Sequence, residues 1–175
     1  GARHRNAGAH MTLPQLLGTC CGVGYLRPAP GTWGSLVALP LTYALHVAGG
    51  FPLLSVITVL AIIVGLWAAT EMTRGQDDLD PSEFVLDELA GQMLALWAIS
   101  LPAWLHGLDI TALWPGWVAG FILFRLFDIW KPGPVGWADR KKGPFGVMMD
   151  DVIAGVLAGI GIALLAGFSH GVLGL

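Results

Sequence analysis

Long apolar stretches alternate with short polar ones along the whole chain. Five apolar stretches predict membrane-associated helices, at about 36–48, 52–70, 86–105, 116–130 and 151–173. A helix needs about 20 mostly apolar residues to cross the hydrocarbon core of a bilayer. The first stretch is shorter, so the sequence leaves open whether it crosses fully. The pattern predicts an all-α fold, a polytopic integral membrane helical bundle that forms one domain over residues 1–175.

The N-terminal part of the chain is polar and rich in glycine and proline. We expect residues 1–11 to be disordered or partly vector-derived, and residues 12–35 to form a cytoplasmic or interfacial segment. Pro28 and Pro30 disfavour a helix where they stand, whereas Thr and Ser hydroxyls are common N-caps. The first long helix is therefore predicted to begin near Thr32 or Ser35.

The composition agrees with a membrane protein. Of the 175 residues, 55% are hydrophobic and only 12% are charged, and the mean hydropathy is +0.69. Soluble domains carry about 25% charged residues. The few cations also exclude nucleic acid as an expected partner, because such proteins need a basic surface.

The positions of the charges predict an orientation. Cytoplasmic loops of membrane proteins are enriched in Lys and Arg. If the N-terminus is cytoplasmic, five spans place eight of the nine cations on that side, all except Arg125: Arg3, Arg5, Arg27, Arg74, Lys131, Arg140, Lys141 and Lys142. The same topology places eleven of the twelve carboxylates at or near the cytoplasmic end, with Asp109 as the exception.

The segment FRLFDIWKP, residues 124–132, carries charge on an otherwise apolar helix. Arg125, Asp128 and Lys131 follow one another at i,i+3 steps and share one helix face. A charged side chain at the bilayer centre costs about 2.5 to 3.5 kcal/mol on insertion scales. Such residues are therefore expected to be paired or functional.

Carboxylates mark the ends of three predicted spans on the same side: Asp87, Glu88, Asp128, Asp150 and Asp151. Clusters that offer only oxygen ligands suit Mg²⁺, which is commonly completed by phosphate oxygens. Arg125 and Lys131 suit phosphate as donors and counter-charges. Metal and phosphate together are the simplest interpretation.

Each feature also has a structural alternative. An Asp at a helix start is commonly a cap, and Arg125 with Asp128 could be a structural ion pair. Glycines at i+4 from the acids, Gly91 and Gly155, allow helices to approach closely, but they could instead form a face for a homodimer. The functional interpretation depends on the coincidence across three helices, because caps do not require one another.

Two further patterns are candidate phosphate sites. Cys21 and Arg27 have the C-x5-R spacing of cysteine phosphatases, although Pro28 interrupts the helix that should follow the Arg. Backbone amides near a helix start, with the hydroxyls of Thr32 or Ser35, could also bind a phosphate.

Four motifs together resemble the phosphatidylglycerophosphatase A family. They are PAPGTWGS (28–35), FVLDELAG (84–91), FRLFDIWKPGP (124–134) and GVMMDDVIAG (146–155). The resemblance implies a multi-pass enzyme of the bacterial inner membrane with its active site facing the cytoplasm. It would use Mg²⁺ to remove the terminal phosphate of phosphatidylglycerophosphate, leaving phosphatidylglycerol in the membrane lipid.

The resemblance also implies roles for residues. Metal and catalysis would fall on the acids Asp87, Glu88, Asp128, Asp150 and Asp151. Phosphate binding would fall on Arg125 and Lys131. The nucleophile stays open between water and an aspartate. A carboxylate-lined cation carrier or a membrane scaffold is the alternative function, and a carrier predicts acids near the membrane midplane.

Overall fold

The chain is described by a computed structural model, which covers residues 11–172. Every regular element within that range is a helix, as the apolar pattern predicted. The elements are α1 (Leu13–Gly18), η1 (Val23–Tyr25), α2 (Pro30–Thr73), α3 (Leu86–Ala95), α4 (Trp97–His106), η2 (Ile110–Leu113), α5 (Trp114–Trp130), α6 (Pro134–Asp139) and α7 (Gly143–Val172). The prediction for residues 1–10, and the end of the last predicted span at 173, lie outside the described residues.

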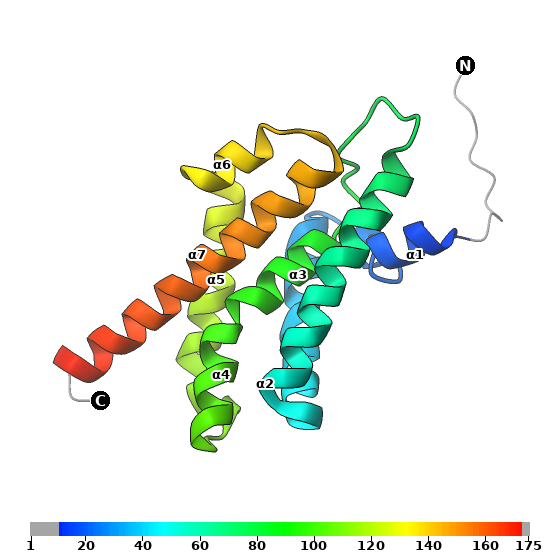
Figure 1. Ribbon diagram of the computed structural model, residues 1–175. Helices are drawn as coiled ribbons and strands as arrows, with labels where there is room; N and C mark the ends of the chain where they lie inside the picture. The colour runs from blue at the N-terminus through cyan, green and yellow to red at the C-terminus, as the bar shows by residue number, and fades with distance from the viewer. Residues whose placement is uncertain (1–10, 173–175) are drawn as a thin grey trace.

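Helix α2 contains the first two predicted segments. Its backbone leaves helical geometry at Gly49 and Gly50, where Gly50 has φ +66°, and the two halves run in opposite directions from this turn (Figure 1). The prediction that the helix begins near Thr32 or Ser35 was wrong. It begins at Pro30, because the fixed φ of proline suits the first helical position and its missing N–H is not needed there.

The predicted single span 86–105 is two helices. Leu96 has ψ −4°, which ends α3 and begins α4, so that the two helices meet at an angle (Figure 1). Helix α3 is therefore short and lies in the middle of the bundle, packed against α2 and α7.

The apolar pattern placed no helix between the predicted spans 116–130 and 151–173, and this was wrong. Helix α6 lies inside this stretch, and α7 begins at Gly143 rather than at Asp151. Two prolines of this stretch stand where helices tolerate them: Pro134 is the first residue of α6, and Pro144 is the second residue of α7. Asp150 and Asp151 consequently lie two turns inside α7 and do not cap it.

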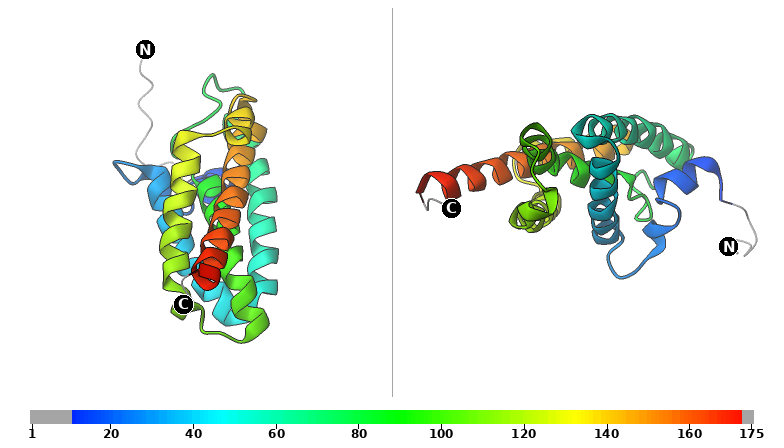
Figure 2. Two further views of the ribbon diagram at one scale, coloured as in Figure 1. Left: turned by 90° about the vertical axis from the view of Figure 1, so that its left-hand side faces the viewer. Right: turned by 90° about the horizontal axis from the view of Figure 1, so that it is seen from below.

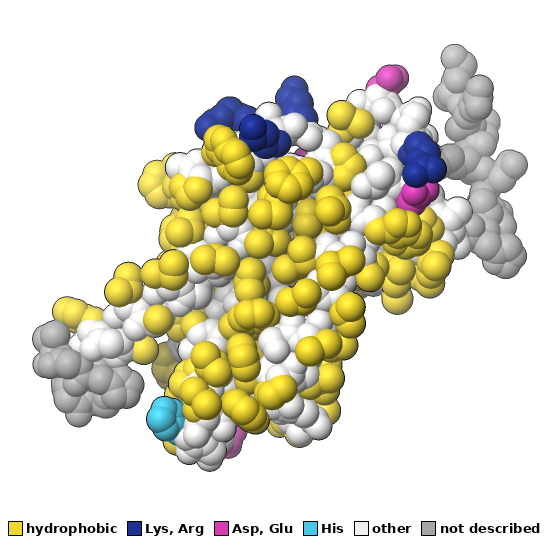
Figure 3. Space-filling model, viewed as in Figure 1, with side chains coloured by type: hydrophobic (Ala, Val, Ile, Leu, Met, Phe, Trp, Pro, Cys, Tyr) yellow, Lys and Arg dark blue, Asp and Glu magenta, His cyan; other side chains and the backbone are white. Residues whose placement is uncertain are grey.

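Three helices in the described part of the chain are long and apolar enough to cross a membrane: Pro30–Thr73, Ile110–Trp130 and Gly143–Ser169. Apolar side chains cover the flank of the bundle, and Lys and Arg gather at one end, above α6 (Figure 3). These surfaces indicate a membrane protein.

Helices α3 and α7 approach each other closely in the centre of the fold. A Cβ added to Gly91 would lie 2.6 Å from the carbonyl oxygen of Asp151, and one added to Gly155 would collide with the carbonyl of Gly91. The predicted close approach is confirmed, and it occurs within one chain. These two glycines are buried, so they do not form the alternative dimer face. Two views at right angles show α7 crossing the bundle beside α3 and α5 (Figure 2).

Candidate active site

The start of α3 is held in place by the N-terminal segment. The N–H of Val85 donates to the carbonyl of Gly18 at 2.9 Å, and Phe84 packs against the same glycine. This anchor presents Asp87 and Glu88 in the first turn of α3. Asp87 is only 7% exposed, and its Oδ1 accepts from the N–H of Glu88 at 2.9 Å.

The glycine contact brings the acids of α7 to the same place. Asp151 is 2% exposed, and one oxygen each of Asp87, Glu88 and Asp151 lies within 4.8 Å of the other two. The predicted meeting of α3 and α7 is therefore present. Carboxylates buried at this separation repel one another unless a cation or protons compensate them.

The donor set fits a divalent cation. Glu88 Oε2 is buried and has no hydrogen-bond partner among the described residues. A buried acceptor without a partner is unfavourable, by about 1 to 3 kcal/mol. Mg²⁺ binds hard oxygen ligands such as carboxylates. Asp87, Glu88 and Asp151 supply three carboxylates close together, and the Glu88 Oε2 oxygen remains available as a ligand.

Asp128 reaches the site from α5. Its Oδ2 accepts from Arg125 Nη1 at 2.5 Å, and both side chains are largely buried. Asp151 has Asp128 and Glu88 as electrostatic neighbours, so three helices contribute acids to one centre. The ion pair predicted as the structural alternative for Arg125 is present. Arg125 is not among the residues that line the cavity, although it packs with Glu88 against Gly31.

Lys131 joins two acids at the rim of the centre. Its ammonium donates to Asp150 Oδ2 at 2.7 Å and also to Asp139 Oδ1. Burial would lower the pKa of Lys131, but these hydrogen bonds outweigh it and raise the pKa above the ordinary value. Lys131 therefore remains charged at neutral pH.

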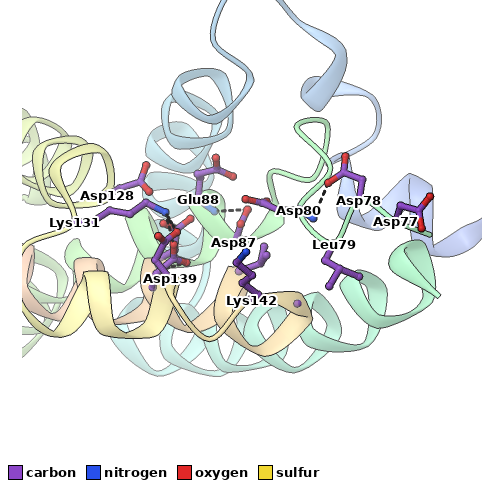
Figure 4. Close-up of a pocket in the computed structure, with 14 residues that line it drawn as sticks. Asp77, Asp78, Leu79, Asp80, Asp87, Glu88, Asp128, Lys131, Asp139 and Lys142 are labelled. Atoms are coloured by element: carbon purple, nitrogen blue, oxygen red, sulfur yellow. Dashed lines mark hydrogen bonds and ion pairs between the residues drawn. The ribbon is translucent and has the colours of Figure 1, made fainter. Parts of the chain in front are cut away.

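These groups surround a cavity of about 500 Å³ (Figure 4). Its lining is dominated by charged side chains: Asp77, Asp78, Asp80, Asp87, Glu88, Asp128, Lys131, Asp139, Lys142, Asp150 and Asp151. Two of these residues are cations, and of the two only Lys131 is in an ion pair within the described chain.

Several lining residues were missed as site candidates from the sequence. Asp77, Asp78 and Asp80 belong to the acidic loop after α2, and Asp139 and Lys142 flank the turn between α6 and α7. The sequence did indicate where the acids among them lie, because the predicted topology collects eleven of the twelve carboxylates at one end of the spans. It did not assign these residues a role.

The other candidate phosphate sites lie apart from the cavity. Thr32 and Ser35 are not among its lining residues. Ser35 is fully buried, and its hydroxyl has no hydrogen-bond partner in the described part of the chain. Cys21 and Arg27 are exposed and do not line it either. Burial, followed by the charge of Glu88, raises the pKa of the neighbouring Cys20 to about 12, so that thiol is not a nucleophile at neutral pH.

Comparison with known sequences gives a consistent family. The sequence model of phosphatidylglycerophosphatase A matches residues 16–166. Phosphatidylglycerophosphatase A of Escherichia coli K12 is 34% identical over 145 residues, which are 82% of this chain and 77% of that protein. The Haemophilus influenzae protein of the same name is 35% identical over 145 residues, 82% of each chain.

A third relative has another name. A Bacteroides thetaiotaomicron protein provisionally named a phosphatidylinositol-3-phosphatase is 38% identical over 156 residues, 87% of this chain and 92% of that protein. No solved structure matches the chain.

Proposed function

The chain belongs to the phosphatidylglycerophosphatase A family, and from this premise we propose that it hydrolyses the terminal phosphate monoester of phosphatidylglycerophosphate to phosphatidylglycerol. The family makes it a phosphoric monoester hydrolase. The observation that supports this substrate class best is the convergence of Asp87, Glu88 and Asp151 at the wall of a charged cavity.

We propose Mg²⁺ as the cofactor, held by Asp87, Glu88 and Asp151 with Asp128 beside them. When bound, Mg²⁺ would polarise the phosphoryl oxygens and neutralise part of the substrate's charge. The protein's part is to bury these acids together, which the close approach of α3 and α7 does.

The chain's own groups then have separate tasks. Lys131 and Lys142 line the cavity and would donate hydrogen bonds to the phosphoryl oxygens. Asp150 is engaged at both oxygens, by Lys131 and by the N–H of Asp151. Asp128 is engaged by Arg125 through Oδ2, which leaves Oδ1 to accept the proton of an attacking water.

We favour water over an aspartate as the nucleophile, because Asp87 and Asp151 are better used as metal ligands. An aspartyl intermediate would appear as phosphate bound covalently to the enzyme after an acid quench of a reaction in progress. Rapid turnover without trapped phosphate supports water.

The surface suggests how a lipid reaches the site. The cavity lies at the end of the bundle where Lys and Arg gather (Figure 3), so a phosphorylated headgroup could enter it while the acyl chains remain beside the apolar flank. In line with the enrichment of cations in cytoplasmic loops, we propose that this end faces the cytoplasm of a bacterial inner membrane.

The deciding experiment is phosphate release by the detergent-solubilised protein from phosphatidylglycerophosphate, with Mg²⁺ and with a chelator. We expect release with Mg²⁺ that stops in chelator. No release contradicts the proposed reaction, and undiminished release in chelator contradicts the cofactor. Phosphatidylinositol 3-phosphate should be assayed in parallel, since one relative is named for it.

A carrier function is less well supported. The carboxylates lie at the cavity end of the bundle, with Asp128 near the end of α5 and Asp150 two turns into α7. A scaffold would not require three helices to converge their acids.

A further inference from the structure

Lys131 stands at a sharp change of chain direction. It ends α5 in a left-handed conformation, with φ 52° and ψ 55°, and its N–H donates to the carbonyl of Phe127 at 2.8 Å. This conformation costs a residue with a side chain about 1 to 2 kcal/mol. The turn leads at once into α6, whose Gly136 packs so tightly on Lys131 that an added Cβ would lie 2.6 Å from the Lys131 carbonyl oxygen.

This packing places the end of α6 opposite the Lys131 side chain. Asp139 is the last residue of α6, and its carboxylate accepts from the Lys131 ammonium. Asp150, from α7, accepts from the same ammonium at 2.7 Å. Three separate elements therefore meet at one nitrogen atom, and all three side chains line the cavity.

The ammonium group still has capacity for a substrate. It has three N–H donors, of which Asp139 and Asp150 use two. A lysine side chain is otherwise flexible, and holding it at two points removes most of that freedom. A phosphate monoester offers three strong acceptor oxygens for the remaining donor.

The two carboxylates differ in exposure. The Asp150 side chain is 7% exposed, whereas that of Asp139 is 43% exposed. Asp139 makes no hydrogen bond to the buried acids Asp87, Glu88 and Asp151 within the described chain, and its ion pair with Lys131 connects it to the centre.

We propose that Asp139 is a positioning residue of this enzyme, which holds the Lys131 ammonium against Asp150 so that its third N–H donor meets the phosphoryl group of the lipid substrate. The inference rests on the proposed function and deepens it. Asp139 acts through Lys131 and does not touch the substrate itself.

The test is a double-mutant cycle on phosphate release. We expect Asp139→Asn to lower kcat/KM about 10-fold, and Lys131→Met to lower it about 10²-fold, because displacement of a positioned group by 1 Å can cost that much. If Asp139 acts through Lys131, Asp139→Asn produces almost no additional loss in the Lys131→Met background. Asp139→Glu, which keeps the carboxylate, should recover most of the activity.

The matched control is Glu71→Gln. Glu71 forms an exposed i,i+3 ion pair with Arg74 at 2.6 Å, and it does not line the cavity. Its removal should leave kcat/KM within about 2-fold, as expected for a surface ion pair.

The outcomes separate this inference from the proposed function. A wild-type protein that releases no phosphate refutes the function, and the role of Asp139 with it. An active wild type together with a fully active Asp139→Asn variant refutes only the inference. The same holds if Asp139→Asn loses equal activity in both backgrounds, because the residue then does not act through Lys131.

Discussion

The two ends of the bundle hold their acids in opposite ways. At the end away from α6, Asp109 caps η2: its Oδ1 accepts from the N–H of Thr111 at 2.9 Å and from the Thr111 hydroxyl at 2.7 Å. These hydrogen bonds lower the pKa of Asp109. At the cavity end, Asp87 and Asp151 are buried beside Glu88, and one oxygen of Glu88 has no hydrogen-bond partner within residues 11–172.

The difference distinguishes a capping acid from a ligand. Asp109 accepts both hydrogen bonds from Thr111, two positions away, and is exposed to solvent. It therefore needs no compensating charge. The acids at the cavity need a compensating charge from elsewhere, because buried carboxylates that share a site are unfavourable together. A capping acid such as Asp109 requires no compensating charge. The cavity acids require one because the packing of α3 against α7 buries them together.

Substitution of a buried acid should have the largest effect. We expect Asp151→Asn and Asp128→Asn each to reduce phosphate release by about 10²- to 10³-fold, since metal-assisted charge stabilisation amounts to several kcal/mol. Asp109→Asn should retain activity within about 2-fold. The measurement is kcat/KM on protein that inserts normally in membranes. Near-normal rates for Asp151→Asn would assign that residue a structural role.

Mg²⁺ should stabilise the folded protein by binding at the cavity end, and this stabilisation should not depend on Asp109. At 100 times its dissociation constant, a ligand that binds only the folded state adds about 2.7 kcal/mol. We expect thermal unfolding of the wild type and of Asp109→Asn to shift upward with Mg²⁺, and that of Asp87→Asn to shift much less. An equal shift in all three proteins would place the ion elsewhere.

Moving α3 away from α7 should weaken the cluster of buried acids at the cavity end of the bundle. Gly91→Ala places a Cβ 2.6 Å from the Asp151 carbonyl oxygen, and overpacking of this kind costs about 1 to 3 kcal/mol. We expect a lower melting temperature and weaker Mg²⁺ binding. The control is Gly167→Ala in α7, the helix that carries Asp151, because no heavy atom lies within 4 Å of its added Cβ. Equal behaviour of the two variants would contradict the role of this contact.

Substitutions of two adjacent lysines should distinguish an effect at the cavity from an effect of surface charge. Lys142 lines the cavity, whereas Lys141 lies 4.8 Å from the ring centroid of Trp137 and does not line it. Lys142→Ala should raise KM about 10-fold, the lower range for a hydrogen bond to a charged group. Lys141→Ala, with the same change of charge, should alter KM little. A larger effect at position 141 would argue against Lys142 as a phosphate donor.

The smallest effect is in the pH dependence of stability. The pKa of folded Lys131 is raised above 10.5, so while Asp139 and Asp150 are ionised its ion pairs contribute fully below that pH, and they are lost as pH rises through the folded value. The difference in thermal stability between wild type and Lys131→Met should be constant from about pH 7 to about pH 9. Asp109 behaves oppositely: its contribution is present above 3.8 and is lost as pH falls through its lowered pKa. A Lys131 contribution that disappears near neutral pH would show that the ion pairs do not form.

Much of the site was predictable because charge is conspicuous on apolar helices. Asp87, Asp128 and Asp151 were identified from the sequence, and all three line one cavity. The glycines at i+4 correctly indicated where helices approach. The helix boundaries were less predictable near prolines, since α2 begins at Pro30, α6 begins at Pro134 and Pro144 is the second residue of α7.

The contacts across elements were not predictable. Lys131 was assigned to phosphate alone, but its partners lie 8 and 19 residues further along the chain. No local spacing records such a meeting, because it depends on the turn at Lys131, the short helix α6 and the early start of α7. Thr32 and Ser35 were expected at the phosphate for their local sequence, but neither lines the cavity, and the glycines beside them, Gly31 and Gly34, pack against Glu88 of α3.

The sequence by itself determined that this is an all-helical membrane protein with acids and cations concentrated towards one end, because the hydrophobic effect and the energy of burying charge depend on residue type and order along the chain. Only the tertiary structure decided which acids share a centre and which lysine is tied to them. Those choices depend on distances of a few ångströms between helices, which are set by side-chain size at contacts such as Gly91 with Gly155 and by the turns that aim one helix at another.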